Sequence, residues 1–194
     1  MNINANFDIL FYLTHPRNKY CEQTLFEINT MLYLAELLSI YDGCNSLDWG
    51  YGFARNKYGA PVSIEIMDEV DFLCQNGYLL KDQLGYYRLS DKVSIGSIVS
   101  LSKSKFLGWK SKYIEAVFDS LLTKSFPKVV HAVQNEPGIS FLESIGRTSS
   151  LLESGLINAL YDDFSTLQEM IGDTQIDLVV PASLWIDYLC AQEQ

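Results

Sequence analysis

The sequence predicts a mainly α-helical protein with one short β-hairpin. The run from Pro61 to Asn76 repeats apolar residues at helical spacing, with a proline suited to its first turn and Gly77 suited to the left-handed position after its end. Two short apolar segments then flank the turn residues Asp82–Gly85 and so predict two paired strands. Because other helical stretches precede this helix and its hairpin wing, the arrangement is the winged-helix pattern.

Two regions follow from the pattern. Residues 1–100 are expected to form the winged-helix half, and residues 101–194 a helical half packed on it. Of the 194 residues, 48% are hydrophobic, which is enough to bury a core. The formal net charge is −10, and each half carries 7 basic and 12 acidic residues, so neither half has the composition of a nucleic-acid-binding module.

The composition also predicts the compartment. The four cysteines lie far apart, so reduced thiols are expected in place of a disulfide framework or a zinc site. The first residues include several asparagines where a signal peptide needs a basic start and an unbroken apolar stretch. The apolar runs are shorter than the roughly 20 residues that span a bilayer. We therefore expect a cytoplasmic protein without membrane contact.

Helices are predicted before the hairpin. Phe7–Leu13 is apolar and should form a short helix that ends before a proline. Glu22–Tyr41 should form a long helix, in which Thr24 caps the first turn and Glu27 completes a capping box. The alternating aromatic and glycine residues at 49–53 permit an edge strand or an irregular segment.

The predicted helix at 61–76 is acidic. It contains Glu65, Asp68, Glu69 and Asp71 and has no Lys or Arg. In a DNA-binding winged helix the corresponding helix enters the major groove among the phosphates. Four negative charges oppose that approach, so a winged-helix fold would not by itself imply DNA binding for this chain. The face with Glu65, Asp68 and Glu69 is instead a candidate protein contact.

One basic patch follows a serine-rich segment, residues 90–102, which we expect to be a linker or a last strand. Lys103, Lys105, Lys110 and Lys112 are interleaved with aromatic residues, which suits contact with a nucleic-acid backbone or an acidic protein surface. The alternative is the solvated start of a helix. These lysines are the candidate DNA-proximal residues.

Helices should also fill the C-terminal half. They are expected at 109–122, 128–134, 140–145 and 150–171, and from Pro181 onward. The last of these carries Trp185 and Tyr188, and it is either a clasp on the core or a docking element. We take Trp185 and Tyr188 as candidate protein contacts, because buried aromatic anchors dominate many interfaces.

Catalytic patterns are missing from the sequence. The two histidines, His15 and His131, lie in unrelated segments, and no nucleophile elbow or phosphate-binding loop occurs. The sequence therefore predicts a protein that is not an enzyme and needs neither metal nor cofactor.

Several short motifs within residues 20–90 resemble two bacterial groups. These motifs are Met31–Glu36, Trp49, Tyr58–Ser63 and Leu73–Leu79. The chain resembles the middle component of ABC-three-component defence systems, which includes the accessory subunit of Lamassu-type anti-phage complexes. It is also similar to the Panacea antitoxin domain, although Ala60 interrupts the Tyr-Gly-Pro tripeptide typical of that group.

The first resemblance implies a non-catalytic accessory subunit of a bacterial anti-phage complex. Such a subunit binds an SMC-like coiled-coil ATPase, helps to hold an effector that is often a nuclease, and contacts DNA only within the complex. The second resemblance implies an antitoxin that neutralises a partner toxin. The fold pattern leaves a third function open, a winged-helix transcription regulator that binds duplex DNA by itself.

Overall fold

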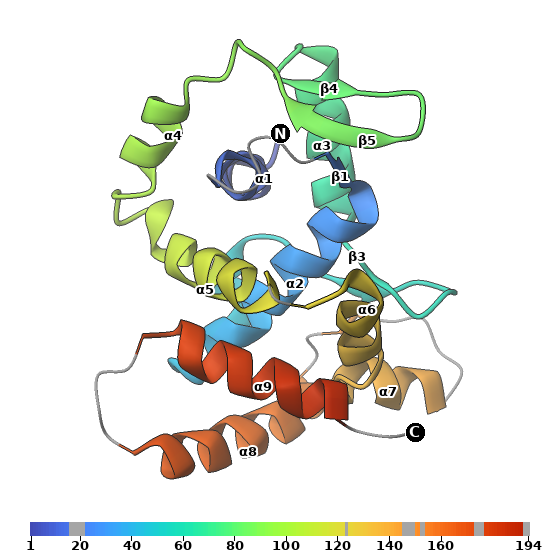
Figure 1. The fold of residues 1–194 in the computed structure, drawn as a ribbon, viewed down its shortest axis with the longest axis vertical. Coiled ribbons are helices and arrows are strands. Elements are labelled where there is room, and N and C mark those ends of the chain that lie inside the picture. The colour runs from blue at the N-terminus through green and yellow to red at the C-terminus, as the bar shows by residue number, and fades with distance from the viewer. Residues whose placement is uncertain (16–21, 123, 145–149, 152–153, 173–176, 192–194) are drawn as a thin grey trace.

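A computed structural model describes residues 1–15, 22–122, 124–144, 150–151, 154–172 and 177–191 (Figure 1). Within these ranges the protein is mainly helical, as predicted, with nine α-helices, a three-stranded antiparallel sheet and a two-stranded one. In chain order the elements are α1 (Ile3–Thr14), β1 (Gln23–Thr24), α2 (Leu25–Tyr41), the 3-10 helix η1 (Ser46–Trp49), β2 (Ala54–Arg55), β3 (Pro61–Val62), α3 (Ile64–Gln75), β4 (Leu79–Lys81), β5 (Tyr86–Leu89), α4 (Ile95–Leu101), the 3-10 helix η2 (Gly108–Lys110), α5 (Ser111–Leu121), α6 (Phe126–Gln134), α7 (Pro137–Ser144), α8 (Ser154–Ile171) and α9 (Val179–Ala191).

Side-chain caps begin the first two helices. The Asn2 side chain accepts hydrogen bonds from two backbone N–H groups of the first turn of α1, so this helix starts earlier than predicted. At α2, Thr24 Oγ1 accepts a hydrogen bond from the Glu27 N–H at 3.2 Å, and the Glu27 carboxylate accepts one from the Thr24 N–H at 2.6 Å. The predicted capping box is confirmed.

The predicted hairpin is also confirmed. β4 and β5 pair in antiparallel fashion, with Leu79 opposite Leu89, and β1 adds a third strand on the other side of β5. The strand order is β1-β5-β4. β1 has two residues and no alternating pattern of its own, so the sequence alone does not predict it.

The chain before α3 differs from the prediction of a helix that starts at Pro61. The proline lies in β3, which pairs with β2, and α3 begins only at Ile64. The reason is Ser63, which caps α3. Its hydroxyl oxygen accepts a hydrogen bond from the Ile66 N–H in the first turn of the helix. Its own backbone N–H donates a hydrogen bond to Asn29 Oδ1 of α2 at 2.8 Å. Gly77 follows the helix with a φ of 71°, as predicted.

The prediction of a linker or a last strand at 90–102 is wrong, because this segment contains the helix α4. Ser94 caps α4 by accepting a hydrogen bond from the Ser97 N–H at 3.3 Å. Ile98 is its buried residue, and the helix packs on α1. A helix of 7 residues is too short for its apolar spacing to distinguish it from a strand.

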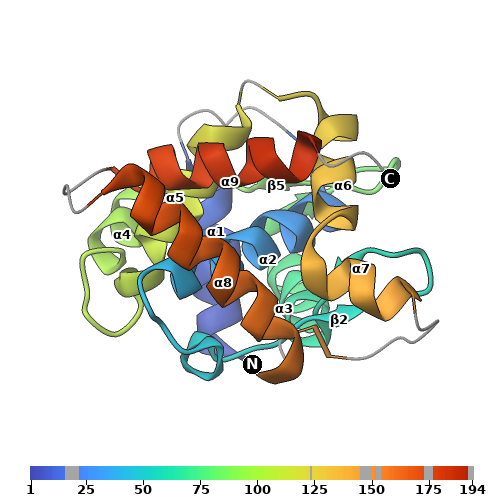
Figure 2. The same ribbon diagram turned by 90° about the horizontal axis from the view of Figure 1, so that it is seen from below.

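The central helix α2 joins the two halves of the chain. It lies between α3 with its hairpin on one side and α8 and α9 on the other (Figure 1). α5 packs on both α2 and α9, and α9 also packs on α6 (Figure 2). The helices α5 to α9 correspond to the five predicted ones, with α9 starting at Val179 instead of Pro181. The division into two regions at residue 100 stays a prediction.

Candidate protein-interaction site

The helix α3 has two faces of different chemistry. Its inner face buries Ile66, Val70 and Leu73, and the helix packs on α1. Its outer face exposes three apolar side chains and two carboxylates, and we name these five residues the α3 outer face: Ile64, Met67, Asp68, Asp71 and Phe72. Ile64 is 72% exposed and Met67 42% exposed. Adjoining exposed apolar side chains are typical of a surface that contacts another protein.

Of the three acidic residues predicted to form a contact, Asp68 lies on the α3 outer face. Glu65 is half-buried, and its carboxylate accepts a hydrogen bond from Ser63 Oγ at 2.9 Å. Glu69 is buried, so its prediction as a contact is wrong: its carboxylate accepts a hydrogen bond from Asn6 Nδ2 at 3.0 Å and lies 3.6 Å from the N-terminal ammonium. The start of α1 favours a carboxylate there, because its free N–H groups carry partial positive charge.

The apolar residues of the outer face are not among the predicted contacts. The prediction considered only acidic side chains of this helix as contacts. Ile64, Asp68 and Phe72 recur every four residues, which places them on one side of a helix, and this spacing is the signal that could have identified them.

The two predicted contacts on α9 have different surroundings. Trp185 is 2% exposed, and its ring centroid lies 5.2 Å from that of Phe164 on α8. Its prediction as a protein contact is therefore wrong, because the side chain fastens α9 to the core. Tyr188 is 50% exposed and stays a candidate contact.

The four candidate DNA-proximal lysines do not form one patch. Lys110 is completely buried, which excludes it from a surface contact, and Lys112 forms an ion pair with Asp42 at 2.5 Å. Lys103 and Lys105 are exposed, and their ammonium groups have no ion-pair partner among the described residues. Two unpaired lysines attract DNA weakly, because affinity grows with the number of phosphates that are neutralised. DNA proximity of the exposed lysines stays a prediction.

Lys110 lies in a buried charged cluster, which we define as Asp8, Glu36, Tyr51 and Lys110. The ammonium of Lys110 donates to Asp8 Oδ2 at 2.5 Å and to the Trp49 carbonyl at 3.2 Å. The Tyr51 hydroxyl donates to the same Asp8 oxygen at 2.9 Å. The cluster thereby connects α1 and the segment after η1 with η2, which lies beyond residue 100.

Glu36 on α2 completes the cluster. Both of its carboxylate oxygens are buried and have no hydrogen-bond partner among the described residues. Burial raises the pKa of Glu36 well above its ordinary value, although the Lys110 charge opposes this. Burial also raises the pKa of Asp8 to about 6 and lowers the pKa of Lys110. The four side chains are at most 6% exposed, so their charges interact within the fold.

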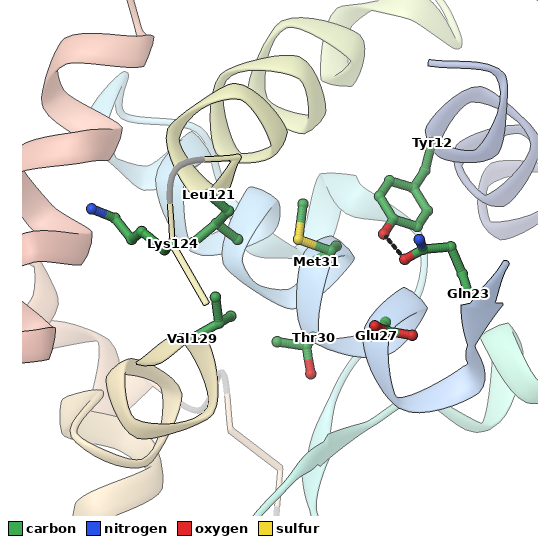
Figure 3. Close-up of a pocket in the computed structure, with 8 residues that line it drawn as sticks. All are labelled: Tyr12, Gln23, Glu27, Thr30, Met31, Leu121, Lys124 and Val129. Carbon is green, nitrogen blue, oxygen red and sulfur yellow. Dashed lines mark hydrogen bonds between the residues drawn. The ribbon is translucent and has the colours of Figure 1, made fainter. Parts of the chain in front are cut away.

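A small hollow lies between α1, α2, α5 and α6 and has a volume of about 130 Å³ (Figure 3). Its lining is partly apolar, with Met31 and Leu121, and the Tyr12 hydroxyl donates to Gln23 Oε1 at 2.7 Å. The Lys124 ammonium points away from the hollow, toward its ion-pair partner on α9. Its lining residues contain no nucleophile paired with a base, the arrangement that covalent catalysis requires.

The described ranges of the chain offer neither a metal-binding cluster nor a membrane-spanning helix. They contain no group of three or more His, Cys, Asp or Glu side chains that could hold a metal ion. Cys44, Cys74 and Cys190 are free thiols, while Cys21 lies outside the described residues. None of the described helices is both long and apolar enough to cross a membrane. That the protein is not an enzyme stays a prediction.

Comparisons with protein-family models, with curated proteins and with solved structures found no significant match for this chain. Its function must therefore be argued from its own residues.

Proposed function

We propose that this protein is a non-catalytic interaction subunit that binds a protein partner through the α3 outer face. The observation that carries the proposal is the composition of that face, three exposed apolar side chains around two carboxylates on a helix without Lys or Arg. The apolar side chains provide area that a partner can bury, and Asp68 and Asp71 favour a partner with basic side chains. The same carboxylates repel a nucleic-acid backbone.

The place of α3 in the chain supports a winged-helix arrangement as part of this proposal. Three helices and β1 precede the β4–β5 hairpin, and β1 joins the sheet beside β5. In helix-turn-helix proteins the helix that corresponds to α3 is the recognition helix, which contacts base edges in the major groove. Here that helix has an acidic and apolar outer face, so we propose that the arrangement serves protein recognition.

The partner we propose is an SMC-like coiled-coil ATPase of a bacterial anti-phage complex, in which this chain also helps to hold an effector such as a nuclease. The support is the resemblance of residues 20–90 to the middle component of ABC-three-component defence systems. Its motifs Met31–Glu36 and Leu73–Leu79 lie in α2 and across the end of α3 into β4. Most of their apolar residues are buried, so these motifs build the scaffold that presents the α3 outer face.

The test is an affinity pull-down of the tagged chain, expressed with its native neighbouring genes and followed by mass spectrometry. A large coiled-coil ATPase and a second effector protein should be recovered. The double variant Asp68→Lys and Asp71→Lys should recover at least about tenfold less ATPase, because lysines then face a basic partner. The matched control is Asp162→Lys with Glu169→Lys, the same charge change at exposed positions of α8.

Two other results would replace this proposal. Recovery of a single small toxic protein, with growth rescued by coexpression, would identify an antitoxin. The structure keeps this alternative open, because Tyr58 of the antitoxin-like motif is 77% exposed beside Gly59, which has a φ of 82°. Binding of the purified chain to duplex DNA with a steep salt dependence would identify a transcription regulator. Equal recovery of the ATPase by the α3 variant and its control would rule out the α3 outer face as the binding site.

A further inference from the structure

A second exposed patch lies on the loop that follows α4. It combines one apolar side chain with two lysines, and we name these three residues the basic patch: Lys103, Lys105 and Phe106. Phe106 is 72% exposed. Its chemistry is the counterpart of the α3 outer face, which combines three apolar side chains with two carboxylates.

The loop that carries the basic patch is held in shape by its own backbone. Ser104 Oγ accepts a hydrogen bond from the Leu107 N–H at 3.1 Å, and the Ser104 carbonyl accepts one from the Gly108 N–H at 2.9 Å. A Cβ on Gly108 would lie 1.8 Å from the Ser102 carbonyl oxygen, so the loop closes on itself at a position that requires glycine. Leu107 is buried and anchors the loop. The two lysines are therefore presented from a defined turn.

We propose that the basic patch of one copy of this chain binds the α3 outer face of a second copy. Lys103, Lys105, Asp68 and Asp71 have no ion-pair partner within their own chain among the described residues. Asp71 interacts electrostatically with Lys81 on β4, so Asp68 is the carboxylate whose charge is less compensated. Pairing opposite charges around apolar side chains orients two protein surfaces and suppresses wrong partners.

The contact must form between copies. Both α3 and α4 pack on α1, which lies between them in both views (Figure 1, Figure 2), so one chain cannot join its own two patches. Two copies can join the basic patch to the α3 outer face in both directions and close a two-fold dimer, or join them in one direction and continue into a ring or an open chain. The net charge of −10 opposes association at long range. The contact is therefore expected near physiological ionic strength, where a Debye length of about 8 Å screens distant charges.

This inference goes beyond the proposed function, because it needs no other protein. A protein partner on the α3 outer face would compete with the second copy, so self-association would keep this face covered until the partner is present.

Sedimentation velocity of the purified chain in about 0.15 M salt tests the proposal, over a wide range of protein concentration. The average mass of the wild-type chain should rise with concentration. Asp68→Lys with Asp71→Lys, and separately Lys103→Glu with Lys105→Glu, should each weaken self-association by more than about tenfold. A mixture of the two double variants should associate again. The lysines on the α3 outer face of the first variant can then pair with the glutamates in the loop of the second variant. Circular dichroism melts of each variant control for folding.

Three outcomes would overturn the proposal: a wild-type chain that is monomeric at every concentration, association that persists in either variant alone, and a mixture that stays dissociated. The lysine variant also separates this inference from the proposed function. It leaves the α3 outer face intact and should recover at least as much ATPase in the pull-down as the wild-type chain does, because no second copy covers that face.

Discussion

The buried charged cluster and the α3 outer face each hold two carboxylates, but the two regions surround them differently. In the cluster, Asp8 has the Lys110 ammonium at 2.5 Å and neither group reaches solvent, and burial favours the neutral form of Glu36. On the α3 outer face, Asp68 and Asp71 are exposed to water and have no ion-pair partner among the described residues. Charges in the first setting act on the stability of the chain, whereas charges in the second act on other molecules.

The largest effect should come from removing the buried cation. Lys110→Met is expected to lower the free energy of unfolding by about 3–5 kcal/mol, because it leaves the buried Asp8 without a counter-charge. Urea denaturation measures the change. Adding Asp8→Asn should recover most of the loss, since an asparagine can still accept the hydrogen bond from Tyr51. If the double variant were as unstable as Lys110→Met, the loss in the free energy of unfolding would come from the packing of the lysine side chain and not from the unpaired charge of Asp8.

A smaller effect of the opposite sign is expected for Glu36→Gln, which should raise the free energy of unfolding at neutral pH by about 1–3 kcal/mol. The raised pKa of Glu36 means that the folded chain keeps a proton that the unfolded chain releases above the ordinary pKa of 4.5. The stability from this site is therefore full below that pH and is lost as the pH rises toward the folded pKa.

The difference between Glu36→Gln and the wild-type chain should accordingly shrink as the solution is acidified. Urea denaturation at several pH values between about 4 and 8 measures it. Asp8, with its pKa raised to about 6, is present in both proteins, but its charge interacts with that of Glu36, so part of the pH dependence of the difference comes from this interaction. A difference that does not vary with pH would show that Glu36 carries its charge in the folded chain.

The smallest effect on stability is expected on the α3 outer face. Asp68→Lys together with Asp71→Lys should leave the free energy of unfolding within about 0.5 kcal/mol of the wild-type value, because exposed charges that form no close ion pair contribute little to folding. The same urea experiment measures it. A loss comparable with that of Lys110→Met would mean that these carboxylates belong to the fold and are not free for binding.

Short-range features of the fold could be predicted from the sequence. The capping box of Thr24 and Glu27, the left-handed Gly77 and the turn at Asp82–Gly85 each depend on residues within a few positions of one another. The strand at Pro61 and the helix α4 were not predictable in the same way, because Ser63 depends on Asn29 and α4 depends on its packing against α1.

The candidate site was predicted in part for the same reason. Asp68 lies on the exposed face that the acidic pattern indicated, but the pattern could not show which of its neighbours turn inward. Glu69 is buried because Asn6, 63 residues away in the chain, donates a hydrogen bond to it.

The sequence by itself determined the mainly helical fold, the hairpin and the acidic character of α3, since these follow from composition and from spacings of a few residues. Only the tertiary structure decided which charges are buried. Lys110 and Asp8 are 102 positions apart, and the burial of a long basic side chain depends on a carboxylate that folding brings to it. Trp185 likewise became part of the core because Phe164 on α8 packs against its ring. Whether a side chain stabilises the fold or remains free to bind another molecule depends on such distant neighbours, and the residue type alone does not specify them.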